Sequence, residues 1–163
     1  MNRRSLLIGF GISTFAATAS TVMANAGNAP VDVLDAYLAA WNAHSSADAA
    51  SHFADNVVYY DASVGSPITG RGAAKTGVID NFLNAVPDAI WTMVGTPIVQ
   101  GDKLAFEWKF SGTNSGNWAD GTKATGKTFS FTGASVFKIG DGMIQSQSDY
   151  YDALGFYKQL GLM

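Results

Sequence analysis

The feature that most constrains the fold of this chain is a change in hydrophobic period near residue 87. Before it, apolar side chains recur every three or four residues, as they do on amphipathic helices. This pattern predicts helices over 31–44, 47–53 and 71–85. After it, apolar and polar residues alternate, as they do in half-buried strands. The predicted strands cover 57–61, 90–94, 104–111, 129–139 and 143–151, and a last helix covers 153–160.

Helices followed by strands that tight turns connect predict an α+β fold. Gly140-Asp141-Gly142 is a hairpin turn, because glycine and aspartate tolerate a positive φ. The glycine-containing segment 114–127 is expected to be a loop. The strands are long and carry many aromatic residues, so we expect a curved antiparallel sheet. Helices would close a conical barrel on its concave side and leave an aromatic pocket.

The first 26 residues have the three-part layout of an export signal. Two arginines at positions 3 and 4 precede an apolar run over 6–22, and Ala-Asn-Ala at 24–26 is a small-x-small cleavage site. The paired arginines resemble a twin-arginine signal, and an ordinary unfolded-export signal is the alternative. Serine and threonine residues make the run a poor membrane span. We expect a single domain over 27–163 that is periplasmic or secreted, with no stable membrane span after cleavage.

Composition excludes several kinds of site. The chain has no cysteine, which removes disulfides, thiolate zinc sites and cysteine nucleophiles. Its two histidines have no clustered partners, so no metal site is expected. Only Arg71 follows the arginine pair and the net charge is −3, so a surface that binds nucleic acid is not expected. No phosphate loop and no serine elbow occur in the sequence.

Several stretches together carry a family resemblance. They are Trp41-Asn42-Ala43-His44, the segments GTNSG at 112–116 and ATGK at 124–127, and the terminal series DGMI at 141–144, DYYDALG at 149–155 and QLG at 159–161. In this order and spacing they resemble the SnoaL-like polyketide cyclase (ester cyclase) family of the nuclear transport factor two-like superfamily, over about residues 31–163. The resemblance implies a deep conical pocket with no metal and no organic cofactor. It also implies ring closure by an aldol reaction, with a pocket aspartate as acid and base.

The resemblance assigns the catalytic aspartate to Asp152 and brings His44 to the edge of the pocket. Asp152 also directly precedes a helix, where aspartate is a favoured N-cap. Asp149 is three residues away and would lie on the opposite face of a regular strand. His44 shares a helical stripe with aromatic residues, or else interacts with the helix C-terminus. Asp61 is the second candidate base, because a period of two places it on the same face as Tyr59, although a turn-capping role is the alternative.

The sequence also departs from the family at pocket positions. Asn114 stands where the family often has a histidine, and Ser146 and Ser148 stand where glutamate and tryptophan are frequent. Asparagine cannot carry a proton as histidine does. The chemistry of the family therefore cannot be carried over unchanged. The residues that we expect to contact a ligand are Trp41, Tyr59, Trp108, Asn114, Trp118, Phe131 and Tyr150.

These observations lead to three hypotheses. The first is a cofactor-free enzyme, an aldol cyclase, isomerase or lyase, that removes a proton α to a carbonyl of a small hydrophobic compound. The second is an exported binding protein that uses the same pocket without chemistry. The third is a dimeric interaction module that works through the outer face of its sheet. A homodimer is the oligomeric state that the resemblance implies.

Overall fold

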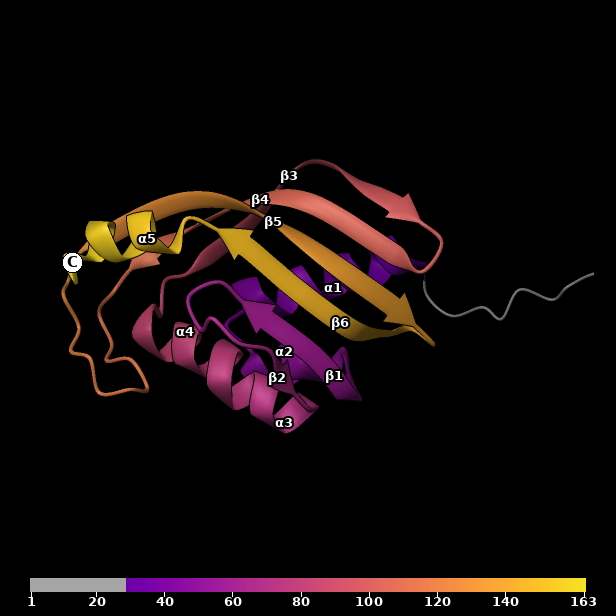
Figure 1. The fold of residues 1–163 in the computed structure, drawn as a ribbon, viewed down its shortest axis with the longest axis horizontal. Coiled ribbons are helices and arrows are strands. Elements are labelled where there is room, and N and C mark those ends of the chain that lie inside the picture. Colours follow the sequence, from indigo (N-terminus) through magenta and orange to yellow (C-terminus); the bar gives the residue numbers. More distant parts are fainter. Residues whose placement is uncertain (1–28) are drawn as a thin grey trace, which may run out of the picture.

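Helices precede most of the strands in the computed structural model, which describes residues 29–163 (Figure 1). The first helices are α1 (Pro30–Asn42) and α2 (Ser46–Ser51). The third helical stretch is continuous and consists of α3 (Arg71–Ala74), the π-helical segment η1 (Lys75–Asp80) and α4 (Asn81–Ala85). Helix α5 (Ala153–Leu160) follows the last strand. The predicted export signal at 1–26 lies outside the described residues.

Six strands form one curved sheet in the order β2-β1-β6-β5-β4-β3. Their bounds are β1 Phe53–Asp61, β2 Ile68–Thr69, β3 Ile90–Gln100, β4 Lys103–Thr113, β5 Thr128–Gly140 and β6 Met143–Tyr151. The predicted α+β class, with a curved sheet and helices against it, is confirmed. Strand β1 runs parallel to β6, however, so the sheet is mixed rather than antiparallel, and it does not close into a barrel. No hairpin joins these two strands, so nothing in the local turn chemistry fixes their direction.

The ends of these elements follow local sequence signals. Pro30 occupies the first turn of α1, where its missing N–H costs no hydrogen bond. Helix α5 ends at Gly161, which has a φ of 71°. Asp141 and Gly142 have φ values of 53° and 72°, as a tight hairpin between β5 and β6 requires. Pro97 lies on the edge strand β3, inside the shift of register between its two halves.

Aromatic rings fill most of the space between the sheet and the helices. Tyr37 of α1 is fully buried, and its ring lies edge-on to those of Trp41 and Trp91. Phe106 and Phe137 continue the cluster from β4 and β5. Helices α1 to α4 pack against one side of the sheet, whereas α5 lies at one end (Figure 1). The interior behind the sheet is therefore a packed core with little free space. Within residues 29–163, none of the helices is long and apolar enough to cross a bilayer.

Candidate functional site

A small cavity, which we call the inner cavity, remains between the sheet and the helices. Its volume is about 30 Å³. It is lined by Trp41, Tyr59, Asp61, Val78, Phe82, Trp91, Trp108, Phe110, Phe131, Asp149 and Tyr151. Two of these side chains, Asp61 and Asp149, carry a carboxyl group, and each is 4% exposed. Apolar and aromatic side chains thus enclose two acids.

Asp149 on β6 is the centre of a buried hydrogen-bond network. The Tyr59 hydroxyl donates to its Oδ2 at 2.7 Å, and the Ser135 hydroxyl donates to its Oδ1 at 2.6 Å. The Gln147 amide donates to both oxygens, at 3.1 and 2.9 Å. Trp108 Nε1 donates to the Ser135 oxygen at 2.7 Å, which fixes that hydroxyl. The network holds the carboxyl of Asp149 in one orientation at the cavity wall.

Asp61 lies directly beside Asp149, because the two residues are register partners on the parallel strands β1 and β6. The backbone N–H and the hydroxyl of Ser63 donate to Asp61 Oδ1 at 2.8 and 2.6 Å. The Tyr151 hydroxyl donates to the same oxygen at 2.9 Å. Each carboxyl of the cavity is therefore paired with one tyrosine hydroxyl, Asp149 with Tyr59 and Asp61 with Tyr151.

Burial changes the acidity of both carboxyls. Loss of water raises the pKa of Asp149 from 3.8 to about 7, and the neighbouring charge of Asp61 adds to the rise, although the hydrogen bonds from Ser135, Tyr59 and Gln147 oppose it. Burial also raises the pKa of Asp61, against the hydrogen bonds from Ser63 and Tyr151. The pKa values of Tyr59 and Tyr151 are raised well above 10, chiefly by burial. Near neutral pH, Asp149 can therefore accept or release a proton while both tyrosines remain hydrogen-bond donors.

Two indole groups add donors at the same cavity. Trp41 and Trp91 line it with their rings 5.4 Å apart, and the Nε1 atom of each has no hydrogen-bond partner among the described residues. Buried N–H groups are usually paired, by protein or by water. The inner cavity thus combines a proton acceptor with donors for an oxygen atom. This combination suits removal of a proton beside a carbonyl group.

The structure places five of the predicted site residues at this cavity: Trp41, Tyr59, Asp61, Trp108 and Phe131. Val57, Tyr59 and Asp61 are every second residue of β1 and share its buried face, as the period of two predicts. Their catalytic and binding roles stay predictions, because their position alone does not establish them.

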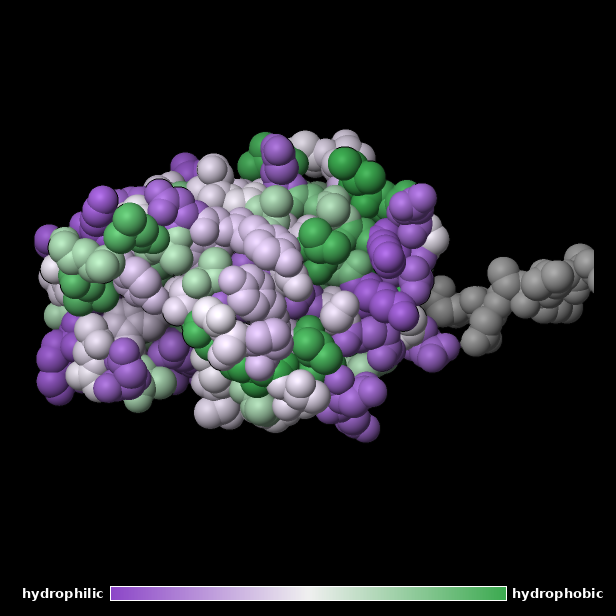
Figure 2. All heavy atoms as spheres, in the orientation of Figure 1, coloured by the Kyte–Doolittle hydropathy of each residue, from purple (hydrophilic) through white to green (hydrophobic). Residues whose placement is uncertain are grey.

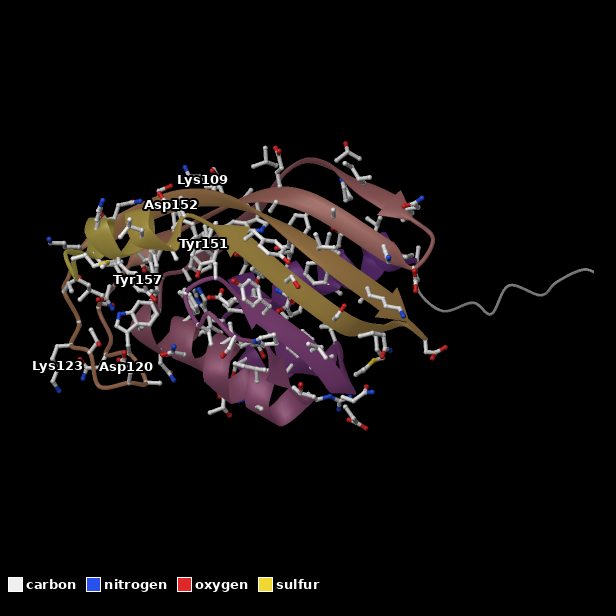
Figure 3. All side chains as sticks on the ribbon, viewed as in Figure 1. Lys109, Asp120, Lys123, Tyr151, Asp152 and Tyr157 are labelled. Atoms are coloured by element: carbon white, nitrogen blue, oxygen red, sulfur yellow. The ribbon has the colours of Figure 1, made fainter. Side chains whose placement is uncertain are left out.

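The expected position of Asp152 is wrong. It is exposed and starts α5, where its Oδ1 accepts the backbone N–H of Gly155 at 2.8 Å (Figure 3). The reason is a bulge in β6. Ile144 pairs with Ile139 of β5 and Ser146 pairs with the residue before Ile139, so Gln145 has no partner. The extra residue reverses the alternation, and Asp149 rather than Asp152 points inward.

Two other expected cavity residues lie on the surface. His44 is exposed beyond the end of α1, has a φ of 54°, and its Nε2 lies 2.8 Å from the Ala89 carbonyl oxygen. Helix α1 ends two residues earlier, so His44 does not lie on the helical face that Tyr37 and Trp41 share. Tyr150 is 53% exposed on the outer face of the sheet, where its ring contacts Tyr60.

Asn114 and Trp118 also lie away from the inner cavity. Asn114 is fully buried, and its amide donates to the carbonyl oxygens of Ala85 and Gly116 at 3.1 and 2.8 Å. Its Oδ1 accepts the Thr125 N–H at 3.0 Å, so the side chain holds the loop at 114–127 in place. Trp118 lies in that loop and lines a second hollow nearer the surface.

Five important residues were not predicted at the site: Asp149, Tyr151, Trp91, Ser135 and Gln147. The alternation of Gln147, Asp149 and Tyr151 in the sequence could have indicated a common face. Counting from Ile144 without a bulge assigned them to the outside. Within residues 29–163, no group of three or more aspartate, glutamate and histidine side chains could hold a metal ion.

Comparisons with known proteins agree with this fold. A model of the SnoaL-like polyketide cyclase family matches residues 31–160. Among solved structures, TsrD from Streptomyces laurentii has 26% identity and a TM-score of 0.69, covering 83% of this chain and 98% of its own. A protein with a ketosteroid isomerase-like fold from Catenulispora acidiphila has 22% identity and a TM-score of 0.68, covering 80% and 92%. A candidate polyketide cyclase from Xanthomonas campestris has 20% identity and a TM-score of 0.69, covering 80% and 96%. No curated protein sequence matches significantly.

Proposed function

The chain belongs to the SnoaL-like polyketide cyclase family, and from this premise we propose that it is a cofactor-free acid–base enzyme acting on a hydrophobic carbonyl compound. The reaction begins with removal of a proton α to the carbonyl, the first step that aldol cyclisation and isomerisation share. The observation that supports this most is the buried carboxyl of Asp149, whose pKa is raised to about 7 at a cavity lined by aromatic side chains.

In the proposed step, the Asp149 carboxylate takes the proton from the α-carbon, and the electron pair of the C–H bond moves to the carbonyl oxygen. The indole N–H groups of Trp41 and Trp91, which line the cavity and have no hydrogen-bond partner among the described residues, are the donors for the developing enolate oxygen. In cyclisation, the enolate carbon then attacks a second carbonyl. In isomerisation, the conjugated enolate takes up a proton at another carbon. Asp149 returns its proton at that stage, so the enzyme regains its starting state. Tyr59 and Ser135 keep the carboxyl in place throughout, since both donate to it.

Asp61 has a supporting role in this scheme. Its Oδ1 accepts hydrogen bonds from Ser63 and Tyr151, which hold the carboxyl at the cavity wall. Its charge contributes to the raised pKa of Asp149. It also positions the Tyr151 hydroxyl. Asp61 thus acts on the base through its charge and keeps the Tyr151 hydroxyl in place.

A non-catalytic binding protein with the same pocket is less consistent with the structure. Burying two neighbouring carboxyls costs free energy that the binding of an apolar compound would not require. Such a cost is typical of a catalytic site, where perturbed acids are used.

Exchange of ketone protons for deuterium tests the proposal directly. 4-Phenyl-2-butanone in D₂O is followed by ¹H NMR with the wild type, with Asp149→Asn and with Asp152→Asn. We expect the wild type to accelerate exchange, with a rate that rises with pH around a midpoint near 7. Asp149→Asn should lower the enzymatic rate about 100-fold or more, as loss of a general base does. The exposed cap variant Asp152→Asn should remain active. Equal rates in the wild type and Asp149→Asn would overturn the proposal.

Export and dimerisation are further proposals that follow from the sequence. Mass spectrometry of the protein recovered from its host tests cleavage after position 26, and a retained Met1 in exported protein would contradict it. Sedimentation at several concentrations tests the homodimer.

A further inference from the structure

Gln147 on β6 has an amide that contacts the proposed base, and it acts there only as a donor. Its Nε2 donates to both oxygens of Asp149, at 3.1 and 2.9 Å, and to the Tyr59 hydroxyl oxygen at 3.0 Å. Its Oε1 has no hydrogen-bond partner among the described residues. Polar side chains on the face shown in Figure 2 can exchange partners with water, whereas Gln147 is fully buried and must find its partners within the protein. The acceptor of this amide is thus unused.

A second buried group, the hydroxyl of Tyr37, lies close to this amide. Tyr37 of α1 is fully buried, and its hydroxyl has no hydrogen-bond partner among the residues that the structure describes. Its ring centroid lies 6.1 Å from that of Phe137, the register partner of Gln147 on β5. Burial raises the pKa of Tyr37 and the charge of Asp149 adds to the rise, whereas hydrogen bonding with groups that include Gln147 opposes it. Because a hydroxyl both donates and accepts, Tyr37 suits either end of the amide.

The surroundings of the Asp149 carboxyl suit only its charged form. Within residues 29–163, its hydrogen-bond partners are Ser135, Tyr59 and Gln147, and all three donate to it. An ionised carboxyl only accepts hydrogen bonds, whereas a protonated one carries an O–H that needs an acceptor. Ser135 or Tyr59 would have to turn its own proton away from Asp149 to become that acceptor. A base that must take up a substrate proton therefore needs a partner that can change its role.

Gln147 can change its role by turning its amide through half a revolution. The turn exchanges the places of Oε1 and Nε2, so Oε1 would lie at the position that is 3.1 and 2.9 Å from the two oxygens of Asp149. The oxygen and nitrogen of an amide are so alike in shape that hydrogen-bond partners decide which is which. At its other end, the turned amide presents Nε2 in place of Oε1, and the Tyr37 hydroxyl can accept as well as donate.

We propose that Gln147 is a positioning residue whose amide turns with the charge of Asp149, with Nε2 facing the carboxylate and Oε1 facing the protonated acid. The proton taken from the α-carbon becomes the O–H proton of Asp149 and is donated to Gln147 Oε1 until it returns to a carbon of the product. Each protonation state of Asp149 then has a matching partner, so one carboxyl acts first as base and then as acid. This inference rests on the proposed function of Asp149.

The other titratable groups that face Asp149 come from three elements. They are Tyr37 on α1, Tyr59 and Asp61 on β1, and Tyr151 on β6. Burial raises the pKa of each tyrosine, so these hydroxyls keep their protons near neutral pH. No hydrogen bond within residues 29–163 connects the Asp61 carboxyl to Gln147. Segments η1, α4, β3, β4 and β5 contribute only uncharged side chains to the lining of the inner cavity. A turn of the amide near pH 7 would therefore report on Asp149.

Nuclear Overhauser contacts of the Gln147 side-chain amide test the turn. They are recorded by NMR at pH 5 and pH 8.5, on either side of the Asp149 pKa of about 7. We expect the amide protons to contact the Tyr59 ring at pH 8.5 and to lose this contact at pH 5. The amide of Gln145, which donates to the Gly140 carbonyl oxygen at 3.0 Å, is the internal control and should not change. The same contacts of Gln147 at both pH values would overturn the proposal.

Asp149→Asn assigns the turn to the correct acid. Asparagine imitates the protonated carboxyl, because it also has a donor beside its carbonyl oxygen. In this variant the Gln147 amide should lack the contact with the Tyr59 ring at pH 5 and at pH 8.5. A contact that still appears as the pH rises would mean that the charge of Asp61, rather than that of Asp149, turns the amide, and would overturn the proposal.

Kinetics of proton exchange test whether the turn contributes to turnover. Gln147→Met keeps the length of the side chain and removes the amide, and Gln100→Met, at an exposed position of β3, is the matched control. With 4-phenyl-2-butanone, we expect Gln147→Met to lower kcat about tenfold or more and to leave KM nearly unchanged, because the base loses its positioning partner. Gln100→Met should keep the kcat of the wild type. A wild-type kcat in Gln147→Met would overturn the positioning role.

The two measurements together separate this inference from the proposed function. An amide that turns in the wild type, in a protein that exchanges no ketone protons, would support the response of Gln147 to Asp149 and contradict the proposed enzyme. Exchange that requires Asp149, with an amide that keeps its contact with the Tyr59 ring at both pH values, would leave the proposed function intact and overturn the inference.

Discussion

Replacement of Asp149 by asparagine should make the stability of the protein less sensitive to alkaline pH. The folded state raises the pKa of this carboxyl from 3.8 to about 7, so between these values it holds a proton that the unfolded chain has released. Stability is therefore lost as the pH rises through this window. Asparagine has nearly the same shape but no charge to bury. The variant escapes the loss.

The size of this effect on stability follows from the shift in the pKa of Asp149. At 1.36 kcal/mol per pKa unit, the change from 3.8 to about 7 corresponds to about 4 kcal/mol once the carboxyl is ionised in both states. At pH 5 less than half of that cost has appeared, and at pH 8.5 all of it has. The free energy of unfolding of Asp149→Asn, relative to the wild type, should thus increase by about 3 kcal/mol between these two pH values. Changes in hydrogen bonding to the asparagine amide are nearly independent of pH and cancel in this comparison.

Urea unfolding at pH 5 and pH 8.5 measures this difference. The free energy of unfolding falls by about 1–3 kcal/mol for each molar increase in urea. The difference between the urea midpoints of variant and wild type should therefore change by about 1–3 M between the two pH values. Asp152→Asn is the control for removal of one negative charge, since Asp152 is exposed and asparagine is an equally good helix cap. The free energy of unfolding of Asp149→Asn, relative to the wild type, could instead be the same at both pH values. In that case burial does not raise the pKa of Asp149, and the argument for its role as base fails.

Three further substitutions examine the surroundings of this acid. Ser135→Ala removes a donor from Asp149 and an acceptor from Trp108 Nε1, so it should lower the free energy of unfolding by about 1–3 kcal/mol and raise the pKa of Asp149 in a ¹³C NMR titration; an unchanged titration would contradict the network. Asp152→Ala should lower the free energy of unfolding by about 1 kcal/mol, measured by thermal unfolding, because α5 loses its cap. A variant that keeps its full stability but no longer catalyses proton exchange would show that the role of Asp152 is not structural. Gly133→Ala would place a methyl group against the Trp108 ring, so it should destabilise the fold by about 1–3 kcal/mol, and an unchanged melting temperature would refute this close packing.

Most of the fold could be predicted because its signals are local. The hairpin at Asp141 and Gly142 depends on residues that tolerate a positive φ, and the end of α5 depends on Gly161. Alternation of apolar residues identified β4, β5 and β6 in the sequence. The parallel pairing of β1 with β6 could not be found in this way, because it depends on contacts between segments about 90 residues apart.

The site was harder to predict because it depends on register. One unpaired residue, Gln145, decides which side chains of β6 point inward, and no glycine or proline marks it in the sequence. Alternation counted from Ile144 therefore assigned the wrong aspartate. Asp61 was placed correctly, since Val57, Tyr59 and Asp61 alternate without interruption on β1. His44 was misplaced because the helix ends before it, at a point that its sequence does not mark.

The pairing of β1 with β6 has a consequence for biosynthesis. Asp61 is made early and Asp149 late, and all the described strands except β6 emerge from the ribosome before the second acid does. Until β6 adds to the sheet between β1 and β5, the first carboxyl stays hydrated and its acidity is that of a free side chain. The nascent polypeptide therefore lacks the neighbouring carboxyl pair, which forms only once β6 has paired with β1.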